Sequence, residues 1–205
     1  MLSTKNIIIK KHARIFISKP INDHDEIWIL FHGYAQNINE FYNLFNNKTY
    51  EDKCFIIPEG LSRFYQKGMK GTVGSSWMTT EDRELEIIDQ KKFLDQIIDD
   101  FGLNNHKINV FAFSQGAATA ARWISNSNIN INKLYFWSGN IPDNILMNKE
   151  DKLWKYSPHF YIGNKDQFTS IEKWEKFTSN LKESQFTIYK GNHYFTPELI
   201  DNYIL

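Results

Sequence analysis

Short apolar runs, each followed by a polar loop, recur along the chain and predict the strands of a buried sheet. The run at residues 27–31 is apolar at every position, as expected for a strand that is covered on both faces. Similar runs predict five further strands, at residues 54–57, 108–113, 134–137, 160–163 and 186–189. Two shorter runs, at residues 7–9 and 14–18, predict an antiparallel hairpin.

Helical patterns lie between these runs. Residues 38–45 predict a helix, and an alanine-rich helix follows Ser114. Thr169 with Glu172 predicts a helix start, with the helix reaching Leu181, and a short terminal helix begins at Pro197. Strands that alternate with helices favour parallel pairing, which predicts a layered α/β fold with a mostly parallel central sheet flanked by helices.

The longest predicted helix runs to about Phe101 after a capping-box pattern, Thr79 followed by Asp82. Its apolar residues recur at helical spacing and predict one buried face: Leu85, Ile88, Leu94, Ile97, Ile98 and Phe101. The stretch 61–79 before it is predicted to be irregular, and loops of this length in a compact domain are often functional.

Composition narrows the class of protein. The 205 residues predict a single domain, 1–205, and 24 basic and 24 acidic residues give no net charge. Without a basic block we expect no nucleic-acid partner. The apolar stretch near the N-terminus is shorter than a signal peptide requires, and no run is long enough to span a membrane, so a cytoplasmic location is expected. Cys54, in an apolar run, is predicted to be a buried small residue rather than a reactive thiol.

Candidate chemistry begins where the apolar run 108–113 meets the alanine-rich helix. Ser114 stands at this junction, with Ala112 two residues before it and Gly116 two residues after it. A strand, a serine and a helix with small flanking residues predict a nucleophile elbow. Ser-x-Gly at a strand end is also typical of an ordinary helix N-cap, so the elbow needs support from a base and an acid.

His193 is the candidate base, because it lies in a loop directly after the last predicted strand and follows Gly191. A serine hydroxyl needs an imidazole to take its proton, and the imidazole needs a carboxylate to hold its tautomer. Asp166, in the loop after residues 160–163, is the candidate acid, because Thr169 and Glu172 are available to cap the next helix. Asp143 is the rival acid.

An oxyanion hole requires two backbone N–H groups aimed at the developing alkoxide. We expect one of these donors to be the backbone N–H of Gln115, the residue after the candidate nucleophile. Tyr34 predicts the other, because it lies in the loop after the strand 27–31, where Gly33 lets the backbone come close to a substrate. No cluster of cysteine and histidine has the spacing of metal ligands, so neither a metal nor a cofactor is expected.

Four segments together resemble one branch of the α/β-hydrolases, the carboxylesterase/phospholipase and acyl-protein thioesterase branch: residues 31–34, 113–116, 163–166 and 191–193. Residues 74–84, GSSWMTTEDRE, look like a bacterial predicted-esterase subgroup. The resemblance implies an α/β-hydrolase fold, a triad of Ser114, Asp166 and His193, and oxyanion donors at Tyr34 and Gln115. The sequence departs from the family pattern at Ala112, which replaces the usual glycine, and at residues 34–37, where the Gly-x-Gly-Asp continuation is absent.

These features predict a serine hydrolase that cleaves small carboxylic esters or thioesters through an acyl-enzyme. Without a large cap domain we expect a shallow pocket that favours short acyl chains. We expect residues 61–77 to lie over the site, with Trp77, Phe64 and Tyr65 contacting substrate; alternatively, these aromatic residues pin the loop to the core. The competing functions are an acyl-protein thioesterase or lysophospholipase, and a binding module with a vestigial triad. The sequence leaves the oligomeric state open.

Overall fold

The computed structural model describes residues 3–45, 50, 52–178 and 185–204. Within these ranges the main sheet has seven strands in the order β1-β3-β2-β6-β7-β8-β9. All neighbouring pairs are parallel except β1 and β3, which pair antiparallel. The strands of this sheet are β1 (Ile15–Ile17), β2 (Glu26–Phe31), β3 (Lys53–Pro58), β6 (Lys107–Phe113), β7 (Asn130–Trp137), β8 (His159–Gly163) and β9 (Gln185–Tyr189).

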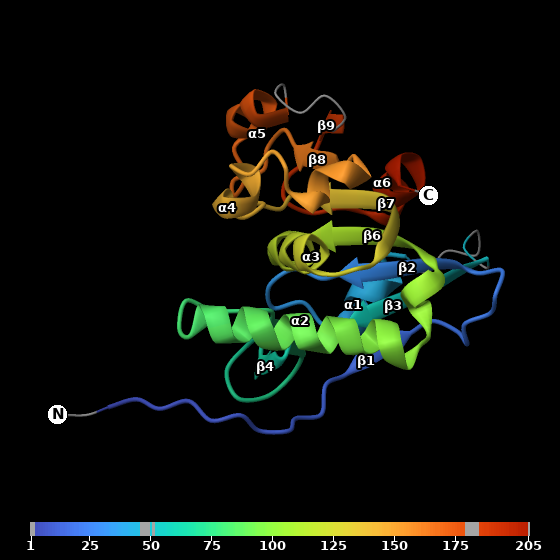
Figure 1. The fold of residues 1–205 in the computed structure, drawn as a ribbon. Helices are drawn as coiled ribbons and strands as arrows, with labels where there is room; N and C mark the ends of the chain where they lie inside the picture. The colour runs from blue at the N-terminus through green and yellow to red at the C-terminus, as the bar shows by residue number, and fades with distance from the viewer. Residues whose placement is uncertain (1–2, 46–49, 51, 179–184, 205) are drawn as a thin grey trace.

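Helices cover both faces of this sheet (Figure 1). One face packs against α2, α3, α4 and α5, whereas the other packs against α1 and α6. The helices are α1 (Ile38–Asn43), α2 (Arg83–Asp100), α3 (Gln115–Asn126), α4 (Asp143–Leu146), α5 (Ile171–Thr178) and α6 (Pro197–Tyr203), with 3-10 turns at Leu103–Asn105 and Lys152–Tyr156. The predicted layered α/β architecture with a mostly parallel sheet is confirmed.

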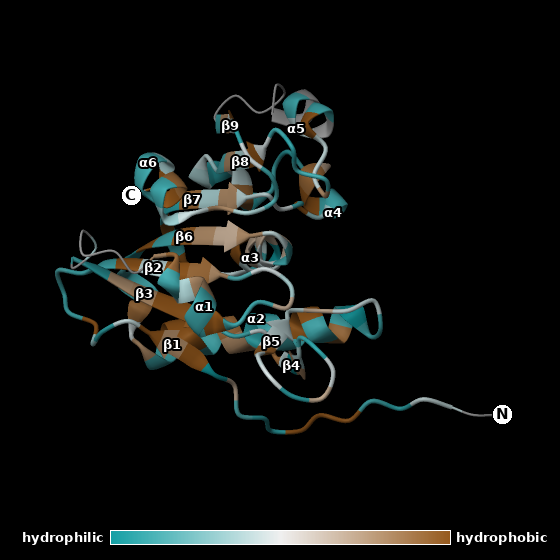
Figure 2. Ribbon diagram, turned by 180° about the vertical axis from the view of Figure 1, so that it is seen from behind, coloured by the Kyte–Doolittle hydropathy of each residue, from teal (hydrophilic) through white to brown (hydrophobic). Residues whose placement is uncertain are grey.

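The continuous apolar pattern of β2 follows from its position inside the sheet. Ile27, Ile29 and Phe31 point into the core on the α2–α3 side, whereas Trp28 and Leu30 point into the core on the α1–α6 side. Side chains alternate between faces along a strand, so a strand with helices on both sides must be apolar at every position. Figure 2 shows the strands largely in the hydrophobic colour, seen from the side of α1.

Two predictions for the first third of the chain are wrong. Residues 7–9 form no strand, and their isoleucine side chains are exposed; β1 instead pairs with β3, with Phe16 opposite Ile57. The stretch 61–79 is irregular only in part, because β4 (Ser62–Tyr65) and β5 (Val73–Ser76) form a separate antiparallel pair within it. The arm before β1 runs along the outside of the molecule (Figure 1).

The helix starts also differ from the predicted caps. Helix α2 begins at Arg83 after Asp82, whose side chain makes no capping hydrogen bond, and Thr79 instead contacts the carboxylate of Glu86. Helix α5 begins at Ile171, and the buried Thr169 hydroxyl has no hydrogen-bond partner in the described part of the chain. The predicted end of this helix, Leu181, lies outside the described residues.

Leu85 and Ile88 on α2 are 43% and 47% exposed, contrary to their prediction as core residues. The buried residues of this helix are Gln90, Leu94, Ile97 and Ile98, so only its C-terminal half is covered by the sheet. Cys54 is fully buried, as predicted.

Candidate active site

The junction between β6 and α3 is a one-residue turn at Ser114. Its backbone has φ 52° and ψ −118°, a conformation that residues other than glycine rarely adopt. The turn is held from both sides, because the Ser114 N–H donates to the Trp137 carbonyl at 3.0 Å and the Ser114 carbonyl accepts from the Ala117 N–H at 3.1 Å. The serine therefore stands at the N-terminus of α3, where the helix dipole favours negative charge.

Small residues make this turn possible. A Cβ atom at Gly116 would lie 2.6 Å from the His32 carbonyl oxygen and 2.7 Å from the Phe31 carbonyl oxygen. Both oxygens belong to the backbone at the end of β2, so they cannot move aside cheaply. Ala112, in the other predicted small position, is fully buried and its methyl group packs into the core, so the turn accommodates alanine there.

The side chains of Ser114, His193 and Asp166 form one continuous series of hydrogen-bond contacts. His193 Nε2 lies 2.9 Å from Ser114 Oγ. His193 Nδ1 lies 3.0 and 3.1 Å from the two carboxylate oxygens of Asp166. Because a carboxylate only accepts, it fixes the proton on Nδ1 and leaves Nε2 to accept from the serine hydroxyl. The imidazole contacts Asp166 and not the rival Asp143, which begins α4.

The Asp166 and His193 side chains differ in how deeply they are buried. The Asp166 side chain is fully buried, whereas that of His193 keeps 13% exposure. The Phe168 N–H also donates to Asp166 Oδ1 at 2.8 Å, so the buried carboxylate has a second donor. A buried carboxylate with several donors holds a fixed orientation, and the imidazole that it contacts is oriented with it.

The loops after β8 and β9 are bonded to each other, which brings Asp166 and His193 together. The Lys165 N–H donates to the Gly191 carbonyl at 2.8 Å, and the Gly191 N–H donates to Asn164 Oδ1 at 3.1 Å. A Cβ at Gly163 would lie 2.3 Å from the Asn192 carbonyl oxygen, so only glycine allows this approach. Adjacent parallel strands thus carry Asp166 and His193 on loops that are hydrogen-bonded to each other.

Tyr189 at the end of β9 is a positioning residue that the sequence did not reveal. Its hydroxyl accepts from Trp137 Nε1 at 2.9 Å and lies 2.7 and 3.1 Å from the carbonyl oxygens of Asn192 and Tyr194. Those two residues flank His193 in the chain, so the phenol holds the loop that carries the imidazole. Burial raises the pKa of Tyr189, which keeps the hydroxyl as a donor.

The backbone N–H groups of Tyr34 and Gln115 follow β2 and β6, which are neighbours in the sheet with Phe31 opposite Ala112. In the described residues neither N–H group has a hydrogen-bond partner. The turn at Tyr34 is anchored on both sides, because Gly33 N–H donates to Gln36 Oε1 at 2.6 Å and Ala35 N–H donates to the Ser75 carbonyl at 2.9 Å. Two unpaired donors therefore stand on neighbouring strand ends beside the serine.

His32 lies under this turn and is fully buried. Its Nδ1 contacts the Gly33 carbonyl at 2.6 Å, and its Nε2 accepts from the Gly60 N–H at 3.1 Å and lies 3.0 Å from Ser75 Oγ. Burial lowers the pKa of His32 to about 4, so the ring is neutral near pH 7. The ring therefore ties the end of β2 to two other segments of the chain without carrying charge.

Trp77 is fully buried, and its indole N–H donates to the His32 carbonyl at 2.8 Å. The side chain is therefore part of the core, which favours the alternative that it pins the segment after β5 in place. Phe64 packs its ring 5.5 Å from that of Tyr34, and Tyr65 is 48% exposed. Both stand on β4, outside the series of contacts around Ser114.

Two aromatic residues other than the predicted ones, Phe168 and Tyr194, lie exposed beside the His193 imidazole. Their rings lie 4.8 and 6.3 Å from the His193 ring, and their side chains are 64% and 69% exposed. Sequence reasoning missed both, although each lies within two residues of Asp166 or His193. Their exposure next to the His193 ring makes them surfaces that a ligand at this site would meet.

The chain matches the phospholipase/carboxylesterase family over residues 12–200, which is nearly its whole length. The chain belongs to this family. As a member of the phospholipase/carboxylesterase family it is a hydrolase of the esterase type, and the predicted relation to the α/β-hydrolases is confirmed. A search of curated proteins finds no significant match.

Solved structures of low sequence identity share the fold of this phospholipase/carboxylesterase family member. Esterase PE8 has a TM-score of 0.68 at 18% identity, with 93% of this chain and 95% of that chain covered. Acyl-protein thioesterase 2 of Zea mays has a TM-score of 0.65 at 18% identity, covering 93% and 96%. A carboxylesterase of Bacillus cereus has a TM-score of 0.63 at 16% identity, covering 93% and 94%.

The described residues hold no group of three or more histidine, cysteine, aspartate or glutamate side chains that is suited to a metal ion. In the same part of the chain, no helix combines the length and the apolar character needed to cross a bilayer.

Proposed function

We propose that the protein is a serine esterase that cleaves carboxylic esters through an acyl-enzyme, with Ser114 as nucleophile, His193 as general base and Asp166 as the orienting acid. The observation that carries the proposal is the series of contacts from Ser114 Oγ through the imidazole to the buried carboxylate. A serine in such a series is activated, because the imidazole takes the hydroxyl proton as the oxygen attacks.

In the first half of the reaction Ser114 Oγ attacks the ester carbonyl while His193 Nε2 takes its proton. The imidazolium then returns this proton to the departing alcohol, which leaves the acyl group on the serine. In the second half a water molecule attacks the acyl-enzyme while His193 takes a proton of that water. The imidazolium then gives this proton to Ser114 Oγ as the carboxylic acid leaves, which restores the enzyme. Asp166 stabilises the imidazolium in both halves.

The Tyr34 and Gln115 N–H groups are proposed to hold the oxyanion of each tetrahedral intermediate. Support comes from their unpaired state in the described residues and from their place on adjacent strand ends. Donors fixed before the reaction need no reorganisation as charge develops, and one such donor contributes roughly 2.7–4 kcal/mol to the transition state in a well-studied serine protease.

Fluorophosphonate labelling tests the nucleophile. The probe phosphonylates an activated serine, so wild type should be labelled and Ser114→Ala should not. Ser62→Ala, on β4, is the matched control and should be labelled like wild type. Equal labelling of Ser114→Ala would refute the assignment, and an unlabelled wild type would favour a binding module with a vestigial triad.

A preference for short acyl chains is proposed as well. It is supported by the absence, in the described residues, of any inserted domain between the strand ends that carry Ser114 and His193 and the surface. A series of 4-nitrophenyl esters from acetate to laurate measures this preference. We expect kcat/KM to be highest for the short members, and a maximum at the long members would overturn the proposal.

The second candidate activity is thioester hydrolysis, because one of the similar structures is an acyl-protein thioesterase of Zea mays. Oxoester and thioester carbonyls pass through the same kind of oxyanion, so the triad serves both. Matched butyryl oxoester and thioester substrates separate the two activities by their kcat/KM ratio.

A further inference from the structure

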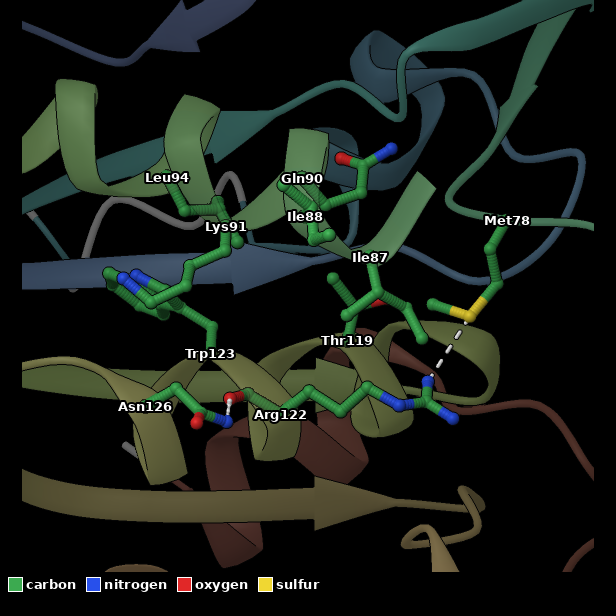
Figure 3. Close-up of a pocket in the computed structure, with 10 residues that line it drawn as sticks. All are labelled: Met78, Ile87, Ile88, Gln90, Lys91, Leu94, Thr119, Arg122, Trp123 and Asn126. Atoms are coloured by element: carbon green, nitrogen blue, oxygen red, sulfur yellow. Dashed lines mark hydrogen bonds between the residues drawn. The ribbon is translucent and has the colours of Figure 1, made fainter. Parts of the chain in front are cut away.

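A cavity of about 190 Å³ lies between α2 and α3, on the α2–α3 face of the sheet (Figure 3). It is larger than the ~150 Å³ engineered cavity that stays dry and binds benzene. The cavity is lined by Met78, Ile87, Ile88, Gln90, Lys91, Leu94, Thr119, Arg122, Trp123 and Asn126.

Much of the wall of this cavity is apolar. Leu94 and Trp123 are buried in its inner wall, whereas Ile88 stays 47% exposed at its edge. Leu85, one turn earlier on α2, is also exposed. The apolar stripe of α2 thus continues past the part that the sheet covers. An apolar body entering between the helices would remove Ile88 from water, which is favourable in proportion to the area covered.

Two polar atoms of the lining residues have no hydrogen-bond partner in the described part of the chain: Gln90 Oε1 and Thr119 Oγ1. Both residues are 3% exposed. Gln90 Nε2 donates to the Trp77 carbonyl at 2.8 Å, which fixes the orientation of the amide. Unpartnered buried polar atoms are costly, and Thr119, as a hydroxyl, can donate to an incoming acceptor.

Arg122 borders the same cavity three residues after Thr119, so both side chains stand on one face of α3. Its Nη1 contacts the Met78 sulfur at 3.1 Å (Figure 3), and a thioether is a weak acceptor for a guanidinium. No carboxylate of the described residues lies within ion-pair distance of Arg122. Burial and then the nearby Arg83 lower its pKa, an effect that attraction from Glu84 only partly offsets.

The other cation of the wall is already neutralised, because Lys91 pairs with Asp95 at 2.5 Å. Arg122 is therefore the lining cation that lacks a carboxylate. A partly buried guanidinium without a counter-ion gains from an oxyanion more than an exposed one does, since less water competes for its donors.

A polar clamp separates this cavity from Ser114. The Gln115 side chain accepts from the Trp77 N–H at 3.1 Å and donates to the Met78 carbonyl at 2.9 Å. The Met78 sulfur thus faces the cavity, whereas the backbone carbonyl of Met78 accepts from the Gln115 amide. A molecule between α2 and α3 would contact the wall behind the proposed oxyanion donor without entering the series of contacts around Ser114.

We propose that this cavity is a second ligand site, which binds a small carboxylate with an apolar body. The apolar part lies between α2 and α3 against Leu94 and Trp123, and the carboxylate accepts from Arg122 and Thr119. The site depends on these residues alone and holds whether or not Ser114 is a nucleophile.

Isothermal titration of the Ser114→Ala protein with octanoate tests the site without hydrolysis. We expect octanoate to bind at one molecule per chain. Octanamide, a neutral compound of equal length, should bind at least about tenfold more weakly, because a charge-assisted hydrogen bond contributes roughly 1.5–3 kcal/mol. Acetate, which lacks the apolar body, should not bind measurably. No binding of octanoate, or equal binding of octanoate and octanamide, would overturn the proposal.

Variants of the lining residues locate the binding. Arg122→Met should weaken octanoate at least about tenfold and leave octanamide unchanged, and Ile88→Trp should fill the cavity and abolish binding of both. The matched controls are Arg63→Met on β4 and Ile8→Trp in the exposed arm before β1, which change the same residue types outside the cavity lining and should bind as wild type. Thermal melting verifies that each variant folds. Unchanged octanoate affinity in Arg122→Met, or equal losses in the controls, would overturn the site.

Discussion

The buried His32 makes the fold sensitive to mild acid. Its imidazole is fully buried, and its pKa falls from 6.5 to about 4. In the unfolded chain the His32 imidazole therefore becomes protonated near pH 6.5, whereas in the folded chain it becomes protonated only near pH 4. Below its unfolded pKa a proton-binding group of this kind favours the unfolded state, so stability present above about pH 6.5 is lost as the pH falls toward 4.

The size of the effect follows from the two pKa values. Integrating the proton linkage from pH 7 to pH 5 gives a loss of about 2 kcal/mol in the free energy of unfolding, and the full shift corresponds to about 3 kcal/mol. Burial of the ring is the main cause of the lowered pKa. In addition, Nε2 already accepts from the Gly60 N–H, so a proton on Nε2 would face a donor. Burial also lowers the pKa of the partly buried His159 to about 4, so this residue adds to the acid sensitivity of the fold.

Urea denaturation at pH 7 and pH 5 measures the effect in wild type and in His32→Gln. His159 and the carboxylates are common to both proteins, so the difference between their pH dependences reports His32 alone. We expect wild type to lose about 2 kcal/mol more than the variant. Equal pH dependences would refute the argument. If the variant does not fold, an NMR titration of the His32 ring in wild type decides, and a pKa near 6.5 refutes it.

Three further predictions concern the site. Asp166→Asn should leave the His193 ring in place but offer it the wrong tautomer, so kcat for ester hydrolysis should fall by about 10⁴; unchanged kcat would contradict the proposed triad. Gly116→Ala should unfold at lower urea concentration than wild type, because its Cβ would lie 2.6 Å from the His32 carbonyl oxygen; urea midpoints measure this. Gln115→Ala keeps the backbone N–H but loses the clamp, so kcat should fall less than in Asp166→Asn while serine labelling persists, and a larger fall in kcat would argue against this.

The parallel sheet and the contact between Ser114, Asp166 and His193 were predictable from sequence, because both depend on local patterns. Continuous apolar runs indicate strands covered on both faces, and loops directly after such strands must meet at one edge of the sheet. The Ser114 elbow is likewise a local feature, since its small neighbours are adjacent in the chain.

The errors arose where a residue's environment depends on distant segments. The isoleucines at residues 7–9 look like a core strand, yet they lie before β1 and remain exposed. Leu85 and Ile88 have helical spacing, but α2 extends beyond the sheet that it covers. Trp77 stands in a glycine-rich stretch that resembles a loop, and only the fold reveals that its indole N–H reaches the His32 carbonyl. Periodicity reports which residues share a face, but not whether anything covers it.

The backbone of Ser114 carries a consequence for engineering this enzyme. Its left-handed φ of 52° suits glycine better than serine, and a strained residue of this kind costs roughly 1–3 kcal/mol. Selection for heat resistance alone would therefore favour Ser114→Gly, a more stable protein without the hydroxyl that we propose as the nucleophile. Screens for durability in this scaffold should accordingly be coupled to turnover.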